Sequence, residues 1–164
     1  MHRQDGWTRR RLFKGIGGAL LGGVALQVIG ARTARAHLEA DIDQTINVIM
    51  GDSVEGKPTF FFEIEGKVNE AAKFAVKIGQ TIRFVFQNQG KVLHDAHFGR
   101  DPDLAGRFFM KNLVAPFDML ELDSGQTGKI TFSFTQDHVG DWEIGCFQPA
   151  HYETGMKVPF TVQP

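Results

Sequence analysis

The chain has 164 residues, with 18 Lys and Arg against 19 Asp and Glu, a formal net charge of −1 and a single Cys. One cysteine excludes an intramolecular disulfide, a zinc site built from cysteine pairs and a binuclear copper centre that needs two thiolates. The sequence also contains no Gly-rich phosphate-binding loop.

The first 36 residues have the three-part layout of a bacterial signal peptide. Residues 8–14 read TRRRLFK, a basic stretch with a twin-arginine pattern, and a Gly-rich apolar run follows over residues 15–30. Residues 34–36 read ARA, an A-x-A cleavage site that makes His37 the predicted mature N-terminus. We expect cleavage there and a periplasmic protein exported by the twin-arginine (Tat) route. The inverted order of Leu and Phe after the arginines leaves the general secretory route open, and an uncleaved anchor is the weaker alternative.

The predicted mature segment, residues 37–164, is acidic and has the size of one domain. Seven of the 18 basic residues but only one of the 19 acidic residues precede residue 37, so the segment has 11 basic and 18 acidic residues, a net charge of about −7. This balance argues against nucleic acid or an anionic membrane surface as the partner and allows a basic protein partner. In an oxidising compartment, the lone thiol should be buried or metal-bound.

Apolar and polar residues alternate in short runs throughout this segment, which predicts β-strands separated by Gly, Asn and Asp turns. Seven or eight short strands in about 120 residues predict an all-β fold, a two-sheet Greek-key β-sandwich with Phe side chains between the sheets. The clearest runs are residues 45–50, 60–64, 74–78, 82–86, 130–134, 142–146 and 158–162.

Residues 100–120 interrupt this pattern. Residues 101–107 predict a turn or a short helix, and large apolar residues then follow without a regular period. We expect a long connection that crosses one side of the sandwich and either packs on the core or supplies an interaction surface.

A Cys-x4-His-x4-Met pattern, formed by Cys146, His151 and Met156, gives three of the four ligands of a blue-copper site. Such a site combines two imidazoles and a thiolate with a distant axial thioether. The second imidazole should come from an earlier strand, and His94 follows a strand-like run. A buried, unliganded Cys146 is the plainer alternative.

Residues 145–157, which read GCFQPAHYETGMK, together with the Leu-His-Asp context of His94, resemble the cupredoxin family. The resemblance covers roughly residues 45–163 and is greatest to plastocyanin- or azurin-like cupredoxins of bacterial copper tolerance. It implies a cupredoxin fold and one type 1 copper ion as the cofactor. It also implies equatorial ligands at His94, Cys146 and His151, and an axial ligand at Met156.

The resemblance further implies that His151 is the exposed electron port, with redox protein partners docking near it. Plastocyanins and azurins commonly have Asn after the first His ligand, whereas this chain has Asp95. An acidic residue there should brace the ligand loop differently and lower the reduction potential.

The remaining candidate ligands are weaker. His97 should point to the opposite face of the strand from His94, and His138 lies in a turn and should be exposed. His37 would chelate copper only as a free N-terminus. Met110 and Met119 offer soft ligands, although core packing is the commoner role of Met.

The primary hypothesis is an exported monomer that transfers single electrons between redox partners. The alternative is a protein for copper tolerance or sequestration. No catalytic residue is assigned and no enzymatic activity is expected, because the sequence has no His-x-His pair and no repeated domain. A Cys146–His151 nucleophile pair would leave Met156 unexplained.

Overall fold

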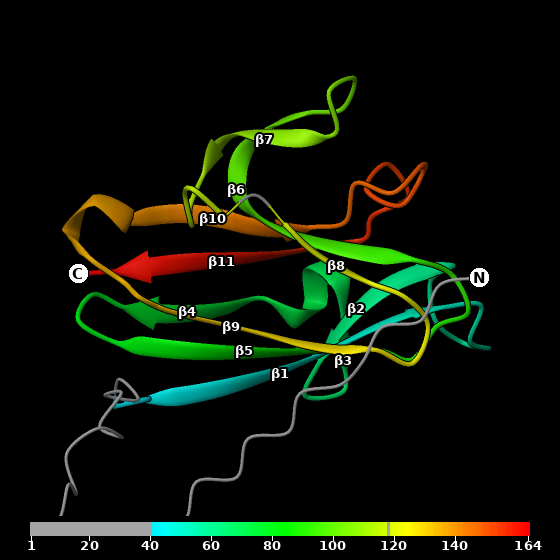
Figure 1. Cartoon of the computed structure of the whole chain (residues 1–164), viewed down its shortest axis with the longest axis horizontal. Helices are drawn as coiled ribbons and strands as arrows, with labels where there is room; N and C mark the ends of the chain where they lie inside the picture. Colours follow the sequence, from blue (N-terminus) through cyan, green and yellow to red (C-terminus); the bar gives the residue numbers. More distant parts are fainter. Residues whose placement is uncertain (1–40, 118) are drawn as a thin grey trace, which may run out of the picture. The chain divides into compact units, whose positions relative to one another are not determined.

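The computed structural model describes residues 41–117 and 119–164 (Figure 1). The predicted export signal and His37 lie outside the described residues. Among the described residues, no helix has the length and apolar character needed to cross a membrane.

The first sheet has five strands in the order β3-β2-β1-β5-β9. β1 runs parallel to β5, and all the other strand pairs of this sheet are antiparallel. Its strands are β1 (Gln44–Asp52), β2 (Phe60–Ile64), β3 (Lys67–Val68), β5 (Thr81–Asn88) and β9 (Thr127–Ser133).

The second sheet follows the order β4-β11-β10-β6-β7, and β8 pairs with β6. β11 is parallel to β4, and the other pairs are antiparallel. Its strands are β4 (Phe74–Lys77), β6 (His94–Asp103), β7 (Phe108–Asn112), β8 (Leu120–Leu122), β10 (Gly140–Gly145) and β11 (Lys157–Gln163). Two 3-10 helices, η1 (Asn69–Ala72) and η2 (Gln136–His138), lie in the connections.

Phenylalanine rings fill the space between the two sheets, as expected. β5 alternates buried and part-buried side chains along most of its length, because successive residues of a strand point to opposite faces. From this strand, the Phe84 ring packs edge-on against Phe98 of β6, with 5.0 Å between the ring centroids. Phe160 of β11 stacks on Phe74 of β4, also at 5.0 Å. The prediction of an all-β, two-sheet sandwich is confirmed.

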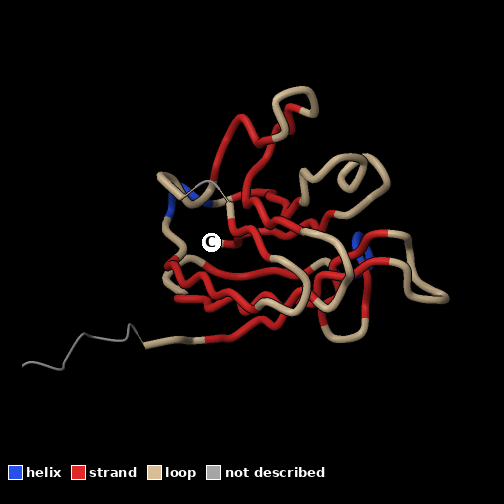
Figure 2. Tube along the Cα trace, turned by 45° about the vertical axis from the view of Figure 1, so that its right-hand side comes forward, coloured by secondary structure: helices blue, strands red, loops and turns tan. Residues whose placement is uncertain are grey.

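The segment from residue 100 to 120 is more regular than its sequence indicates. β6 continues to Asp103, residues 104–107 form a turn, and β7 returns along β6 as a β-hairpin. Figures 1 and 2 show this β6–β7 hairpin projecting from the sandwich. At Gly99 a Cβ atom would lie 2.3 Å from the Cβ atom of Phe109, so only glycine lets the two strands approach so closely. The turn was predicted, whereas β7 was not.

Core packing was the wrong expectation for the two methionines of this segment. Met110 is 72% exposed and Met119 is 45% exposed. Met110 belongs to β7, an edge strand whose side chains alternate between the body of the protein and solvent.

Candidate metal centre

The four predicted ligands come from one strand and one loop of the second sheet. His94 is the first residue of β6, and Cys146 directly follows β10. β10 pairs with both β6 and β11, so the start of β6 and the loop from β10 to β11 meet at one end of the sheet. That loop also contains His151 and Met156, and the structure therefore brings all four residues to the same end.

Three donor atoms form a compact triangle. The Nδ1 atom of His151 lies 3.2 Å from both Nδ1 of His94 and Sγ of Cys146, and the third side, from Sγ to His94 Nδ1, is 3.9 Å. The point in the plane of the triangle that is equidistant from the three atoms is about 2.0 Å from each. This distance matches metal–nitrogen bonds and is slightly shorter than metal–sulfur bonds. All three side chains are buried. This donor set fits one type 1 copper ion.

Met156 is fully buried, and its backbone is hydrogen-bonded to two residues of the triangle. Its backbone N–H donates to the carbonyl of His151 at 2.9 Å, and its carbonyl accepts from the N–H of Cys146 at 3.2 Å. These two bonds close the loop on itself, so that its three candidate ligands are held by backbone hydrogen bonds.

Two glycines give the ligand loop its shape. Gly155 has φ +97°, a conformation that side-chain-bearing residues rarely adopt, and it sits in the turn before Met156. Gly145 is needed for space, because a Cβ atom there would lie 2.9 Å from the Tyr152 ring and 3.1 Å from the Phe109 ring. Phe147 and Tyr152 of the loop form a small buried cluster with Phe109 of β7.

Asp95 braces the ligand loop from β6. Its backbone N–H donates to Sγ of Cys146 at 3.4 Å. Its carboxylate accepts the Phe147 N–H at 2.6 Å and the Gln148 side-chain amide at 2.8 Å. The contacts agree with the expected bracing role and connect the loop to the strand that begins with His94.

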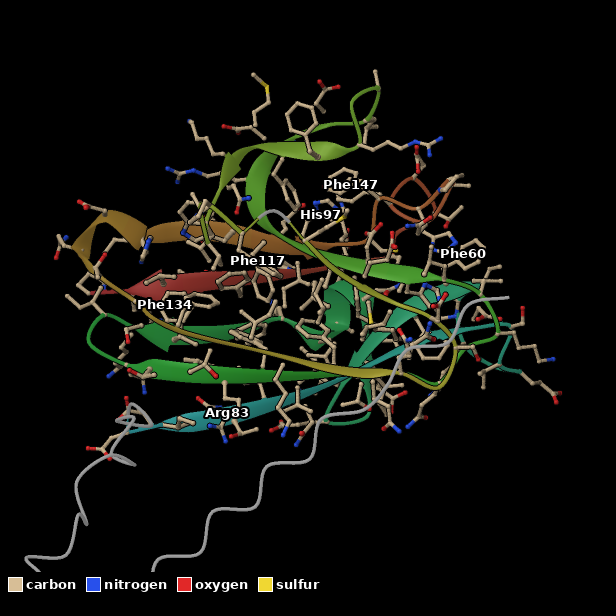
Figure 3. All side chains as sticks on the ribbon, in the orientation of Figure 1. Phe60, Arg83, His97, Phe117, Phe134 and Phe147 are labelled. Atoms are coloured by element: carbon tan, nitrogen blue, oxygen red, sulfur yellow. The ribbon has the colours of Figure 1, made fainter. Side chains whose placement is uncertain are left out.

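Two further residues near the site were missed by the sequence analysis. Oδ2 of Asp52, at the end of β1, lies 3.6 Å from Nε2 of His94. The side chain of Phe60, which is labelled in Figure 3, comes from the start of β2. Its ring stacks on the His151 ring with centroids 3.8 Å apart and an interplanar angle of 21°. Neither residue lies near a ligand in sequence, and Asp52 has the local pattern of a turn residue. The pairing of β1 with β5 brings Asp52 to the site, and the packing of the first sheet against the second brings Phe60 there.

His151 is only 5% exposed, whereas the family resemblance implied an exposed edge. Phe60 is the physical reason, because its ring lies against the imidazole.

Burial controls the protonation of the ligands. It lowers the pKa of His94, although Asp52 opposes that shift, and it lowers the pKa of His151 to about 4, assisted by His94. Burial, followed by the charge of Asp95, raises the pKa of the Cys146 thiol above its usual range. Both imidazoles are therefore neutral at pH 7, whereas the thiol must lose its proton when a metal binds.

The other two histidines in the described part of the chain, His97 and His138, lie outside the triangle. His97 is buried with Nε2 3.5 Å from Oδ1 of Asp95, and its ring packs edge-on against Phe147 at 5.0 Å. His138 is half-buried in η2, where its ring accepts the backbone N–H of Thr135 at 3.0 Å. Its ring has a structural role. The turn pattern had predicted an exposed side chain, whereas His138 is half-buried.

Comparisons with known proteins agree with the fold and with a copper protein family. The family model described as multicopper oxidase matches residues 44–164. The copper-resistant cuproprotein CopI of Rubrivivax gelatinosus is 28% identical over 124 residues, which cover 71% of this chain and 65% of that protein. The chain thus spans less than two thirds of this relative's length.

Solved cupredoxin structures superpose on most of the chain. Rusticyanin from Thiobacillus ferrooxidans has a TM-score of 0.54 at 20% identity, and the match covers 73% of this chain and 77% of rusticyanin. Auracyanin from Roseiflexus castenholzii has a TM-score of 0.50 at 23% identity, covering 75% of this chain and 99% of auracyanin. The chain has a cupredoxin fold and belongs to the multicopper oxidase family.

Proposed function

We propose that the protein binds one type 1 copper ion through His94, Cys146, His151 and Met156 and carries single electrons. The observation that supports this best is the triangle of two imidazole nitrogens and one thiol sulfur, with sides of 3.2, 3.2 and 3.9 Å. A thiolate favours Cu(I), imidazole suits both oxidation states, and a weak thioether ligand tunes the potential.

The stiffness of the site favours electron transfer. The ligand loop is closed by the backbone bonds between Cys146, His151 and Met156, and Asp95 attaches it to β6. Donor atoms that are held by these hydrogen bonds should move little when copper changes its oxidation state. Little movement means a low reorganisation energy and fast exchange of one electron.

A carrier is favoured over an oxidase by the number of candidate centres. In residues 41–117 and 119–164, His94, Cys146 and His151 form the one group of three His, Cys, Asp or Glu side chains whose ligand atoms could hold a metal. A single copper ion accepts one electron at a time, which suits transfer between partners.

Copper tolerance is the second candidate function. It is favoured by the similarity to CopI, a protein named as a copper-resistant cuproprotein. The same four ligands would then bind copper to buffer it, with no redox partner required.

We also propose export to the periplasm and removal of the signal before His37. The basic stretch, apolar run and A-x-A site of residues 1–36 support this. Redox partners would dock over Phe60, since its part-buried ring stacks on the buried His151.

Copper titration of the metal-free chain tests the proposal. One equivalent of Cu(II) should give an intense thiolate-to-copper absorption band and a small copper hyperfine splitting in the electron paramagnetic resonance spectrum. A pale complex with a wide splitting would overturn the assignment of Cys146 as a ligand.

Two further measurements separate the two candidate functions. A carrier should cycle reversibly in potentiometry and exchange electrons rapidly with its own reduced form. A copper buffer should show tight Cu(I) binding in competition with a chelator, slow electron exchange and loss of copper tolerance when the gene is deleted.

A further inference from the structure

Asp52 holds the loop that leads from β5 into β6. Oδ2 of its side chain accepts the backbone N–H groups of Lys91 at 2.5 Å and Val92 at 3.2 Å. Asn88 fixes the same loop by donating to the Val92 carbonyl at 2.8 Å and accepting the Gly90 N–H at 2.9 Å. The carboxylate is therefore held in one place, with both of its backbone partners two or three residues before His94.

The same oxygen faces the ring of His94. Nε2 of His94 lies 3.6 Å from Oδ2 of Asp52, and both side chains are almost completely buried. Within the described part of the chain, this nitrogen is a buried polar atom with no hydrogen-bond partner. Leaving a buried donor unpaired is unfavourable, because the group has lost its hydrogen bonds to water without a replacement. A shift of a few tenths of an ångström would pair it with Asp52.

Gly90 keeps this approach open. A Cβ atom at position 90 would lie 2.0 Å from Oδ2 of Asp52 and 3.0 Å from Nε2 of His94. Any side chain there would therefore occupy the space between the carboxylate and the imidazole. This is a second, independent sign that the local structure is arranged around the Asp52–His94 pair.

A neutral imidazole carries one proton, so the two ring nitrogens of His94 must have different roles. Its Nδ1 faces Cys146 and His151, and a metal ligand needs a free lone pair at that atom. The proton must then be on Nε2, directed at Asp52. Carboxylate partners of this kind fix the tautomer of metal-binding histidines and make the ring a stronger donor.

We propose that Asp52 is a positioning residue for the copper ligand His94. Its carboxylate accepts the Nε2–H of His94, keeps the Nδ1 lone pair directed at the metal, and adds negative charge that favours Cu(II) over Cu(I). The proposal rests on the proposed copper site, but its effect on the histidine tautomer exists without metal.

The first test is nuclear magnetic resonance of the metal-free, ¹⁵N-labelled chain at neutral pH. In the wild-type protein, the His94 ring should be the Nε2–H tautomer. In Asp52→Ala, which removes the oxygen that faces Nε2 of His94, the Nε2–H tautomer should be depleted in favour of the Nδ1–H tautomer. A wild-type Nδ1–H tautomer, or an unchanged tautomer in the variant, would overturn the proposal.

The second test is the reduction potential of the copper-loaded variants. Loss of a partner of a metal-bound histidine commonly changes metal affinity about tenfold or more. If Asp52→Asn weakens Cu(II) binding tenfold relative to Cu(I), the potential rises by about 59 mV. A merely structural role for Asp52 would lower the unfolding temperature and leave the potential unchanged.

Asp43→Asn is the matched control. Asp43 also accepts a backbone N–H, that of Thr81 at 2.7 Å, and its loss changes the net charge equally. It lies nine residues before Asp52 along an extended chain, or about 30 Å away. If the two variants have equal reduction potentials and the wild-type chain shows a type 1 spectrum, the proposed role of Asp52 is overturned, whereas the copper site stands. Absence of that spectrum in the wild-type chain would instead overturn the proposed copper site.

Discussion

The two ends of strand β6 differ in nearly every physical respect. At its start, His94 is completely buried and faces two other candidate ligands. At its far end, the β6–β7 hairpin projects into solvent, and Phe108 and Met110 are 45% and 72% exposed. One continuous strand thus joins a closed site for a small ligand to an open apolar surface.

The stabilising contacts differ in the same way. At the ligand end, the Asp95 carboxylate accepts a buried hydrogen bond from the Phe147 N–H and a part-buried one from the Gln148 side chain. The hairpin instead has an exposed ion pair, Asp101–Lys111, at 3.1 Å. Exposed ion pairs contribute little to stability. Most large exposed hydrophobic residues of the described chain lie between residues 100 and 120, in the hairpin and the connection after it. They are Leu104, Phe108, Met110, Phe117 and Met119. Changes at the ligand end should therefore affect the metal and folding, whereas changes at the exposed hairpin positions should affect neither.

The largest expected effect comes from the candidate thiolate. Cys146→Ser should abolish the intense visible band of the copper-loaded chain, because that band requires a bond from copper to thiolate. Absorption spectroscopy after adding Cu(II) measures it, and Met110→Ser on the hairpin should keep the full band. An intensely coloured Cys146→Ser protein would refute the ligand assignment.

Two adjacent phenylalanines of β7 test whether the hairpin itself has a structural and a free face. Phe109→Ala should destabilise the metal-free chain by about 3 kcal/mol, because its buried ring packs on Phe147 at 5.0 Å. Phe108→Ala should change stability by about 0.5 kcal/mol or less. Urea unfolding measures both, and similar losses in the two variants would contradict the comparison.

The metal-free chain should lose stability as the pH falls from about 6.5 to about 4. The pKa of His151 is lowered to about 4 when folded, so over this range the unfolded chain takes up a proton that the folded chain does not. One such histidine costs about 1.4 kcal/mol for each pH unit, and His94 adds to the slope because its pKa is also lowered. Asp52, whose pKa is lowered too, loses its contribution only at more acidic pH.

Urea unfolding at several pH values measures this slope. His151→Asn should reduce it, while the hairpin variant Phe108→Ala should leave it unchanged. A flat stability profile for the wild-type chain between these pH values would show that the buried imidazoles are not neutral.

The smallest expected effect is a change in reduction potential, which compares the buried thioether of Met156 with the exposed thioether of Met110. Met156→Leu should keep a coloured site but raise the reduction potential by about 59 mV, equivalent to a tenfold change in relative affinity, because an axial donor to Cu(II) is lost. Met110→Leu should leave the potential unchanged, since that side chain is 72% exposed. Potentiometry on both variants decides the matter, and equal shifts would argue against Met156 as a ligand.

The sequence by itself determined the all-β class and most strand positions, because the alternation of buried and exposed residues is a local property of each strand. Most donors of the candidate site could also be recognised from one short stretch of sequence. Cys146, His151 and Met156 fall within one loop, and only His94 had to be sought elsewhere. In the hairpin, the turn at residues 104–107 was readable, but β7 was not, since an edge strand needs only one partner and carries a weak pattern.

Only the tertiary structure decided what surrounds the donors. The parallel pairing of β1 with β5 places Asp52 beside the loop before β6, and the packing of the first sheet against the second lays Phe60 on His151. These contacts join residues more than 35 positions apart, and no local spacing encodes them. They arise because two sheets that bury their apolar faces also fix how the polar residues at their ends meet.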